Sequence, residues 1–204
     1  MTPVTAEALE RRRSRTRDEI LEAAWALCRE HGLAQLSLRD LAARVGMRAP
    51  SLYSYFDSKD AIYDAMFAQG QRQFTAAVGV ELDVDASGGR EAFRRAARGF
   101  FTFCTTDPVR YQLLFQRILP TFVPSEASYA LAVAHLERAG EAMRAAGVTE
   151  PRHLDLWTAL LTGLVDQQIS NDPGGDRWER LLDEAVDLFC DHVGLPGAPT
   201  RRRS

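Results

Sequence analysis

The chain has 204 residues, a formal net charge of −3 and a hydrophobic content of 46%, which is ordinary for a globular protein of one or two domains. The negative charge argues against an unselective nucleic-acid binder, because that class carries an overall basic surface. No apolar run approaches the roughly 18 residues of a membrane span, and the arginine-rich N-terminus does not resemble a secretory signal, so we expect a cytoplasmic protein without a membrane partner.

The N-terminal segment predicts an arm followed by a helix. Residues 1–14 lack apolar periodicity and are expected to be mobile. Beyond them, apolar residues recur on one face with the period of a helix, namely Ile20, Leu21, Ala24, Leu27 and Cys28. Gly32, directly after His31, is the expected C-terminal stop of this helix.

Two short helices separated by a tight turn are predicted between residues 37 and 57. Ser37 is the expected N-cap of the first helix, and Gly46 ends it in a left-handed conformation that glycine adopts readily. Pro50 suits the first turn of the second helix, which we expect to run through residues 51–56. The first helix is predicted to bury Leu38, Leu41, Ala42 and Val45. These dimensions are those of a helix-turn-helix.

The rest of the chain also has helical periodicity. Ser58 is the expected cap of a helix over 58–80, whose inward residues are predicted to be Ile62, Met66, Phe67, Phe74 and Val78. Ser87-Gly88-Gly89 is the clearest linker. Further helices are predicted over 90–106, 108–118, 125–146, 152–171 and 176–193. Because no alternating strand pattern is recognisable, the predicted fold class is all-α.

The residues around the turn suit contact with double-stranded DNA. In a helix-turn-helix, the second helix places its first residues against base edges in the major groove. Arg48 can donate two hydrogen bonds to a guanine, while Ala49 and Pro50 offer apolar surface to a thymine methyl. Hydroxyl groups follow at Ser51, Tyr53, Ser54 and Tyr55. Phosphates are expected to pass close to Ser37, Arg39 and Lys59.

Two longer motifs carry a family resemblance. The runs LAARVGM at residues 41–47 and LYSYFDSKDAI at residues 52–62 closely resemble the signature of TetR-family transcriptional regulators. The segments ILEAA at 20–24 and EHG at 30–32 resemble the family's first helix. The resemblance spans roughly residues 15–65, and it is specific because the spacing, turn glycine, tyrosine pair and Ser-Lys agree together. Cys28 and Leu36 depart from it, where the family commonly has an aromatic residue and a threonine.

The resemblance implies roles for individual residues. Leu52 and Phe56 become core residues, and the positions at or near the bases are Arg48, Ala49, Pro50 and Tyr53. The positions that hold phosphates are Ser37, Arg39, Ser51, Ser54, Tyr55 and Lys59. The implied activity is repression by a homodimer bound to a palindromic operator. The arginines between residues 11 and 17 either reach DNA or form a solvated basic arm, and the sequence leaves both readings open.

The resemblance also implies an N-terminal DNA-binding domain at 13–73 and a larger regulatory and dimerisation domain at 74–195. The last two long helices would form a four-helix bundle with a second subunit. The expected seam comprises Leu156, Leu160, Leu164, Leu181, Leu182, Val186 and Phe189, with Gly163 allowing close approach. A small apolar effector would bind among Phe100, Phe103, Cys104, Tyr111, Phe115, Ile118, Phe122, Trp157 and Leu161, with polar groups from Gln112, Asp166 or Gln167.

Other function classes have less support from the sequence. No nucleophile elbow, phosphate-binding loop or metalloprotease motif is present, so neither an enzyme nor a cofactor is expected. Cys28, Cys104 and Cys190 lack the spacing of a metal or disulfide site and are expected to be buried thiols. A regulator without a ligand and an activator both stay open as alternatives.

Overall fold

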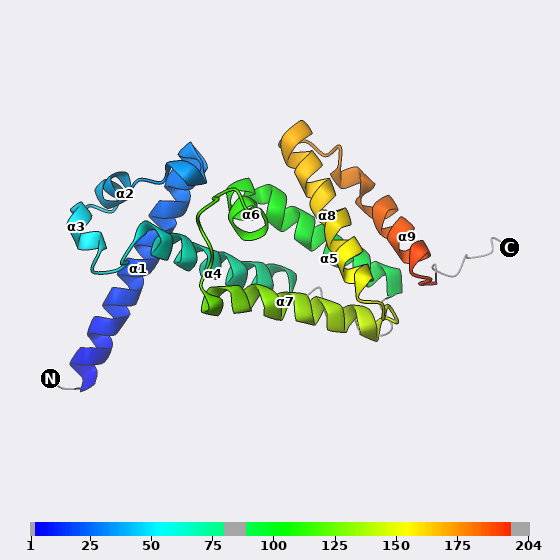
Figure 1. The fold of residues 1–204 in the computed structure, drawn as a ribbon, viewed down its shortest axis with the longest axis horizontal. Coiled ribbons are helices and arrows are strands. Elements are labelled where there is room, and N and C mark those ends of the chain that lie inside the picture. The colour runs from blue at the N-terminus through cyan, green and yellow to red at the C-terminus, as the bar shows by residue number, and fades with distance from the viewer. Residues whose placement is uncertain (1–2, 80–88, 197–204) are drawn as a thin grey trace. The chain divides into compact units, whose positions relative to one another are not determined.

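The chain folds into helices joined by short connections. The computed structural model describes residues 3–79 and 89–196, and within these ranges it contains no strand, which confirms the all-α prediction. The helices are α1 (Pro3–His31), η1 (Leu33–Gln35), α2 (Leu38–Arg44), α3 (Ala49–Leu52), α4 (Lys59–Val78), α5 (Gly89–Thr106), α6 (Pro108–Phe115), α7 (Glu126–Ala145), α8 (Arg152–Asn171), η2 (Glu179–Leu181) and α9 (Leu182–His192), as Figure 1 shows.

These helices group into two compact units. The described residues up to Gly70, together with Gln112–Tyr129, form the first unit. Gln71–Tyr111, together with the described residues from Ala130 onward, form the second unit. Helix α4 therefore contributes residues to both units.

The core of the first unit forms around α1. The five apolar residues of the predicted stripe are all buried, as expected, and Gly32 ends the helix with a positive φ of 87°. The stripe is wider than predicted, because Trp25 is also fully buried and its Nε1 donates to Gln69 Oε1 on α4 (2.7 Å). The indole therefore satisfies its one donor while it fills the core between two helices.

The expectation of a mobile arm over residues 1–14 is wrong, because α1 already begins at Pro3. The first three turns carry no apolar stripe, and the side chains of residues 7–15 are exposed. Alanine, leucine, glutamate and arginine are strong helix formers, and Glu7 pairs with Arg11 one turn later (3.6 Å). Propensity thus extends the helix where hydrophobic periodicity gives no signal.

Helices α2 and α3 form the predicted pair. Ser37 Oγ accepts a hydrogen bond from the Asp40 amide (3.4 Å), and Gly46 ends the turn with a φ of 67°. Helix α3 is shorter than the predicted 51–56, because the chain leaves the helix after Leu52. Ser54 Oγ donates to the Ser51 carbonyl oxygen (2.7 Å), a local bond that competes with helix continuation.

Helix α4 begins as predicted. Ser58 Oγ accepts from the Ala61 amide (3.0 Å), and all five predicted inward residues are buried. The helix ends at Val78, and Ser87 and Gly88 of the predicted linker lie outside the described residues.

A carboxylate on α4 attaches the segment 112–129 to the first unit. Asp64 accepts three hydrogen bonds at the start of α7: from the Ser125 amide (2.7 Å), the Ser125 hydroxyl (2.9 Å) and the Ser128 hydroxyl (2.8 Å). Ser128 is buried, so its hydroxyl has no access to water, and Asp64 supplies the hydrogen-bond acceptor that this hydroxyl needs. Helix α6 ends at Phe115 instead of 118, shortly before Pro120, whose ring disfavours helical conformation in the residue that precedes it.

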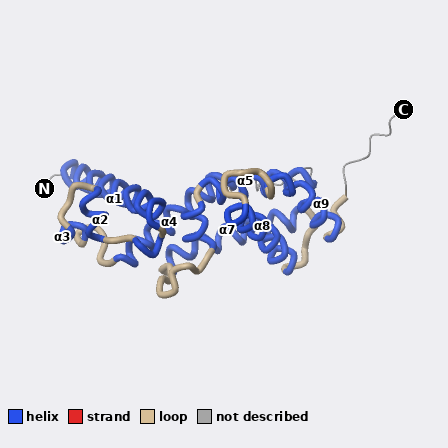
Figure 2. The backbone as a smooth tube through the Cα atoms, turned by 90° about the horizontal axis from the view of Figure 1, so that it is seen from above, coloured by secondary structure: helices blue, strands red, loops and turns tan. Residues whose placement is uncertain are grey.

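The second unit has an aromatic centre whose residues come from α5, α8 and α9, the helices that Figure 2 shows from above. Trp157 lies edge-on to Phe93, with ring centroids 5.3 Å apart, and its ring centroid is 5.0 Å from that of Phe189. All three rings are buried. Such contacts between large rings supply much of the apolar area that a small helical core can bury.

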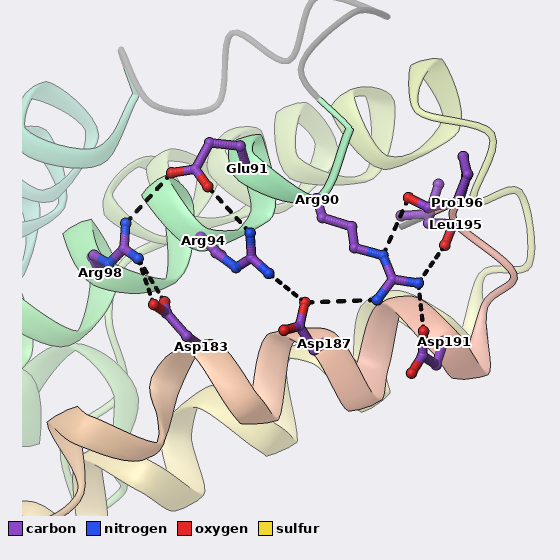
Figure 3. A network of polar contacts seen from close by, with 9 residues as sticks. All are labelled: Arg90, Glu91, Arg94, Arg98, Asp183, Asp187, Asp191, Leu195 and Pro196. Atoms are coloured by element: carbon purple, nitrogen blue, oxygen red, sulfur yellow. Dashed lines mark hydrogen bonds and ion pairs between the residues drawn. The ribbon is translucent and has the colours of Figure 1, made fainter. Parts of the chain in front are cut away.

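Arginine–aspartate pairs join α5 to α9 along their polar side (Figure 3). Arg98 Nη2 is 2.6 Å from Asp183, Arg94 Nη2 is 2.6 Å from Asp187, and Arg90 pairs with Asp191. Arg90 also donates to the carbonyl oxygens of Leu195 (2.6 Å) and Pro196 (3.2 Å), just beyond the end of α9. We call this set the arginine–aspartate ladder.

Helix α9 starts at Leu182, six residues later than the predicted 176, because buried Gln168 organises the preceding residues as a loop. Its Nε2 donates to the Gly175 carbonyl oxygen (3.1 Å), and its Oε1 accepts from the Trp178 amide (2.9 Å). Asp172 Oδ2 accepts from the Arg177 amide (2.9 Å) and so closes the loop.

The predicted seam between subunits is wrong in part. Leu182, Val186 and Phe189 are buried within their own unit, so they offer no surface to another chain. The exposed leucines of these helices are Leu156 (44% exposed), Leu181 (38%) and Leu188 (65%), the last of which was not among the predicted residues. Gly163 is exposed on α8, with nothing within 4 Å of the place where a Cβ would stand.

Candidate DNA-binding site

Helix α3 and the residues that flank it present most of the predicted base-facing residues to solvent. It is held on the first unit by Leu52 and Phe56, which are buried, as the resemblance implies. Tyr53 is 53% exposed although it lies between these two core residues. Arg48, Pro50, Ser51 and Ser54 are also exposed, whereas Ala49 and Tyr55 are half-buried. The sequence therefore builds a short helix with an anchored side and an open side.

The predicted phosphate-holding residues lie at the ends of α2 and α4. Arg39 is exposed in the first turn of α2, and Ser37 precedes it as the N-cap. The Ser37 hydroxyl acts as an acceptor within the cap, so its own hydrogen is available to a phosphate oxygen. Lys59 Nζ is 3.4 Å from the Ala34 carbonyl oxygen and 5.4 Å from the centre of the Tyr63 ring. An ammonium has three donors, and this geometry uses one of them.

Two ties inside the first unit position α2 and η1. Arg44 on α2 donates two hydrogen bonds to the Glu30 carboxylate near the end of α1 (2.7 and 2.6 Å). These bonds hold the pKa of Glu30 below its usual range. The Tyr63 hydroxyl on α4 donates to the Leu33 carbonyl oxygen, and burial raises the pKa of Tyr63 well above its usual range, so it stays protonated. Neither tie was predicted from the sequence.

The arginines of α1 lie against the end of the α3 segment. Arg13 Nη2 donates to the Ser54 carbonyl oxygen (2.8 Å), and Arg17 Nη1 donates to that of Tyr55. The Arg17 guanidinium carbon also lies 4.2 Å from the centre of the Phe56 ring. Because their acceptors are uncharged, these contacts leave the positive charge of both arginines uncancelled on this side of the unit.

The residues predicted to surround an effector divide between the two units. In the second unit, Phe100 and Phe103 contact the Phe74 ring, with centroids 5.9 and 5.1 Å away, and the Tyr111 hydroxyl donates to Asp166 (2.8 Å). Cys104, Trp157 and Leu161 are buried in that unit. In the first unit, the Phe122 ring is 5.6 Å from that of Tyr63, Phe115 is half-buried and Ile118 is 40% exposed.

A pocket of about 350 Å³ opens in the second unit beside these aromatic residues. It shares only Phe103 with the predicted set, and its wall is otherwise more polar than predicted. The lining residues are Ala77, Arg98, Gly99, Thr102, Phe103, Thr106, Asp107 and Arg110. Among the other predicted polar groups, Gln112 is half-buried, and exposed Gln167 accepts from Asn171 (2.7 Å). The effector site therefore stays a prediction.

The three cysteines are free and buried, as expected. Burial raises the pKa of the Cys28 and Cys190 thiols to about 11, and that of Cys104 further. None of the described helices combines the length and apolar character needed to cross a membrane.

Comparison with known proteins agrees with this geometry. Over 64 residues, which are 31% of each chain, the sequence is 39% identical to the HTH-type transcriptional repressor KstR2 of Rhodococcus jostii. Over 104 residues, 51% of this chain and 47% of the relative, it is 28% identical to the HTH-type transcriptional activator FasR of Mycolicibacterium smegmatis. The chain thus spans about half, or less, of the length of these curated relatives.

A solved structure covers far more of the chain. AibR in complex with isovaleryl coenzyme A and operator DNA matches with a TM-score of 0.66 and 19% identity, over 84% of this chain and 96% of that one. Residues 20–66, which run from α1 into α4, match the family model for bacterial regulatory proteins of the tetR family. Within this segment the chain is similar to bacterial regulatory proteins of the tetR family.

Proposed function

We propose that this protein is a transcriptional regulator that binds palindromic operator DNA as a homodimer, represses transcription, and is released by a small apolar ligand. One observation carries the proposal: α3 is anchored by buried Leu52 and Phe56 while Arg48, Pro50 and Tyr53 are exposed. A recognition helix needs this combination, because side chains that read bases must be held rigidly and yet be free of protein partners. Because the proposed target is operator DNA, the proposed place of action is the cytoplasm.

The exposed residues divide by their chemistry into those that would read bases and those that would hold phosphates. Arg48 and Tyr53 would contact base edges, with Ala49 and Pro50 against thymine methyl groups. Ser37, Arg39 and Lys59 would hold phosphates, together with the hydroxyls of α3 and the segment after it, Ser51, Ser54 and Tyr55. The negative net charge of the whole chain does not oppose this, because phosphates respond to the local cluster.

A homodimer is proposed on two grounds. A palindrome presents two half-sites one helical turn apart, roughly 34–36 Å, so one α3 from each subunit can read it. The segment from α8 to α9 exposes the apolar side chains of Leu156, Leu181 and Leu188, and Gly163 would allow close approach of a partner helix. We accordingly propose residues 13–73 for DNA binding and 74–195 for regulation and dimerisation.

Ligand release would work through a shift of populations. A ligand releases DNA only if it binds better to a conformation whose two recognition helices are misspaced. Helix α4 contributes residues to both units, and it is the proposed element that responds. AibR, which has a similar fold, was solved in complex with isovaleryl coenzyme A and operator DNA, so a protein of this fold can hold an organic ligand as well as DNA.

Activation is the second candidate for the direction of control. The similarity to the activator FasR favours it as much as the similarity to KstR2 favours repression, since both relatives match only in part. A DNA-binding regulator that needs no ligand is the remaining alternative. The position of the operator relative to its promoter decides between activation and repression.

Selection of binding sites from a random DNA pool tests the proposal. The purified protein is expected to enrich a palindrome, and a complex of two chains per site is expected in sedimentation. Recovery of no shared sequence would contradict base reading by α3. Recovery of a single half-site with one chain bound would retain the DNA function and overturn the dimer.

A further inference from the structure

Helix α3 is too short to hold its own orientation. It spans only Ala49–Leu52, and a helix of one turn has little stability of its own in water. The turn after it bonds back to the helix, since the Ser54 amide donates to the Ser51 carbonyl oxygen (3.3 Å) and the Tyr55 and Phe56 amides donate to that of Leu52 (2.8 and 2.9 Å). The carbonyl oxygens of Ser54 and Tyr55 themselves lie beyond the helix, so contacts from another element can hold this turn in place.

Two arginines from α1 supply that support. Arg13 and Arg17 are one turn apart on α1, so both point from the same side of the helix. Arg13 donates to the carbonyl oxygen of Ser54 (2.8 Å), and Arg17 donates to that of Tyr55. These carbonyls belong to the turn just beyond α3, where a guanidinium also interacts favourably with the negative end of the helix dipole.

Arg17 has the more restrained position of the two. Its guanidinium carbon is 4.2 Å from the centre of the Phe56 ring, and Phe56 is buried in the first unit. The Arg13 guanidinium carbon is 6.0 Å from the centre of the Tyr55 ring, and its side chain is exposed. The planar guanidinium of Arg17 thus connects the carbonyl of Tyr55 with an anchoring residue of the α3 segment.

We propose that Arg13 and Arg17 are positioning residues for DNA recognition: they fix the orientation of α3 through the carbonyls of Ser54 and Tyr55, and Arg17 has the larger effect. This inference rests on the proposed function, because it assigns a role within the same DNA-binding site. Both arginines fall within the cluster at 11–17, for which the sequence left DNA contact and a solvated arm open. The observed contacts point to a third role.

Salt dependence separates positioning from phosphate contact. A side chain that neutralises a phosphate contributes about one unit to the slope of log affinity against log salt concentration. A side chain that holds α3 through a carbonyl changes operator affinity but not this slope. Lysine also separates the two roles, because it can replace arginine at a single phosphate but cannot reproduce the flat contact with Phe56.

The test compares R17A, R17K and R13A with wild-type protein on the selected operator and on random DNA, over a range of salt concentrations. Arg15 provides the matched control, because it lies on the same helix, is exposed and pairs with Glu19 (3.1 Å). R17A is expected to weaken operator binding about tenfold or more, with the slope unchanged, because one charge-assisted hydrogen bond is lost. R17K is expected to restore part of the affinity, R13A to have a smaller effect, and R15A to leave operator affinity close to wild type.

Hydrogen exchange without DNA makes the inference testable on its own. R17A is expected to speed exchange of the amides of residues 54–56, while R15A leaves them unchanged and both variants keep the helical content of wild type. Unchanged exchange in R17A would overturn the proposal whether or not an operator is found. The proposal would also be overturned, in favour of phosphate contact, if R17A reduced the slope of log affinity against log salt concentration by about one while R17K bound the operator with wild-type affinity.

Discussion

Arginine has different partners in the two units of this protein. In the first unit, Arg13 and Arg17 donate to uncharged carbonyls, so their positive charge is not cancelled by these contacts. In the second unit, Arg90, Arg94 and Arg98 pair with aspartates of α9 in the arginine–aspartate ladder (Figure 3). These arginines thus keep an unpaired charge beside α3 in the first unit and form ion pairs between two helices in the second. The number of arginines in a segment therefore does not locate a DNA-binding surface; their partners do.

The buried stripe of α1 in the first unit also differs in composition from the centre of the second unit. The second unit centres on the contacting rings of Phe93, Trp157 and Phe189, whereas the stripe of α1 in the first unit is mainly aliphatic with a single hydrogen-bonded tryptophan. Stability in the second unit should therefore depend strongly on a few large side chains.

Trp157→Ala is the most severe test of that difference. Removal of this ring should lower the free energy of unfolding by about 3–5 kcal/mol, because it leaves a cavity beside Phe93 and Phe189. Urea unfolding followed by circular dichroism measures the loss. Thr158→Ala, at the neighbouring exposed position, should change stability by no more than about 0.5 kcal/mol. Equal losses in the two variants would contradict the aromatic centre.

His135 gives the second unit a pH dependence. Its ring centroid is 4.3 Å from that of Phe74, and burial, with the nearby charge of Arg138, lowers the pKa of His135 to about 4. The unfolded chain binds a proton at about pH 6.5, so folding stability falls as the pH drops from there toward 4. One pKa unit corresponds to about 1.4 kcal/mol, and solvent screening of this partly exposed ring lowers the expected loss of unfolding free energy to roughly 2 kcal/mol at pH 4.

The measurement compares the unfolding free energies of wild type and His135→Leu at pH 7 and pH 4.5. The leucine variant should lose less stability on acidification, since it has no imidazole to protonate. His31→Gln serves as control, because His31 is exposed on the first unit and should leave the pH dependence as in wild type. Parallel pH profiles for wild type and His135→Leu would show that His135 titrates normally.

The arginine–aspartate ladder should give the smallest effect, graded by burial. Asp187 contacts Arg94, whose side chain is 25% exposed, and Arg90, whose side chain is 14% exposed. Asp187→Asn should therefore cost about 1–2 kcal/mol of unfolding free energy. Asp183 pairs with Arg98, whose side chain is 47% exposed, so Asp183→Asn should cost about 0.5 kcal/mol or less. Thermal unfolding of the two variants checks the order, and a reversed order would contradict it.

Local signals predicted much of the fold. Ser37 and Ser58 cap their helices, Gly32 and Gly46 have the expected positive φ, and the stripes of α1 and α4 are buried. Each of these features depends on residues within a few positions, so their spacing in the sequence carries the information. The exposed Arg48 and Tyr53 follow from the same local pattern.

Features that depend on distant partners were missed. Arg17 meets the Tyr55 carbonyl across 38 positions, and Asp64 meets Ser125 across 61. Spacing along the chain gives no signal for such pairs. The predicted seam between subunits was wrong in part for a related reason. The apolar periodicity of α9 marks Leu182 and Val186 as inward, but it cannot distinguish the core of one subunit from a contact between two subunits.

Operator affinity of Arg48→Ala/Tyr53→Ala, measured over a salt series beside wild type, tests the central claim most directly. Arg95→Ala serves as control, because it removes one exposed arginine from the second unit. We expect the double variant to bind the operator with an affinity reduced by about 100-fold or more, because base contacts worth about 1–3 kcal/mol each disappear. Its affinity for random DNA should fall much less. Equal operator affinity in wild type and the double variant would contradict DNA reading by α3.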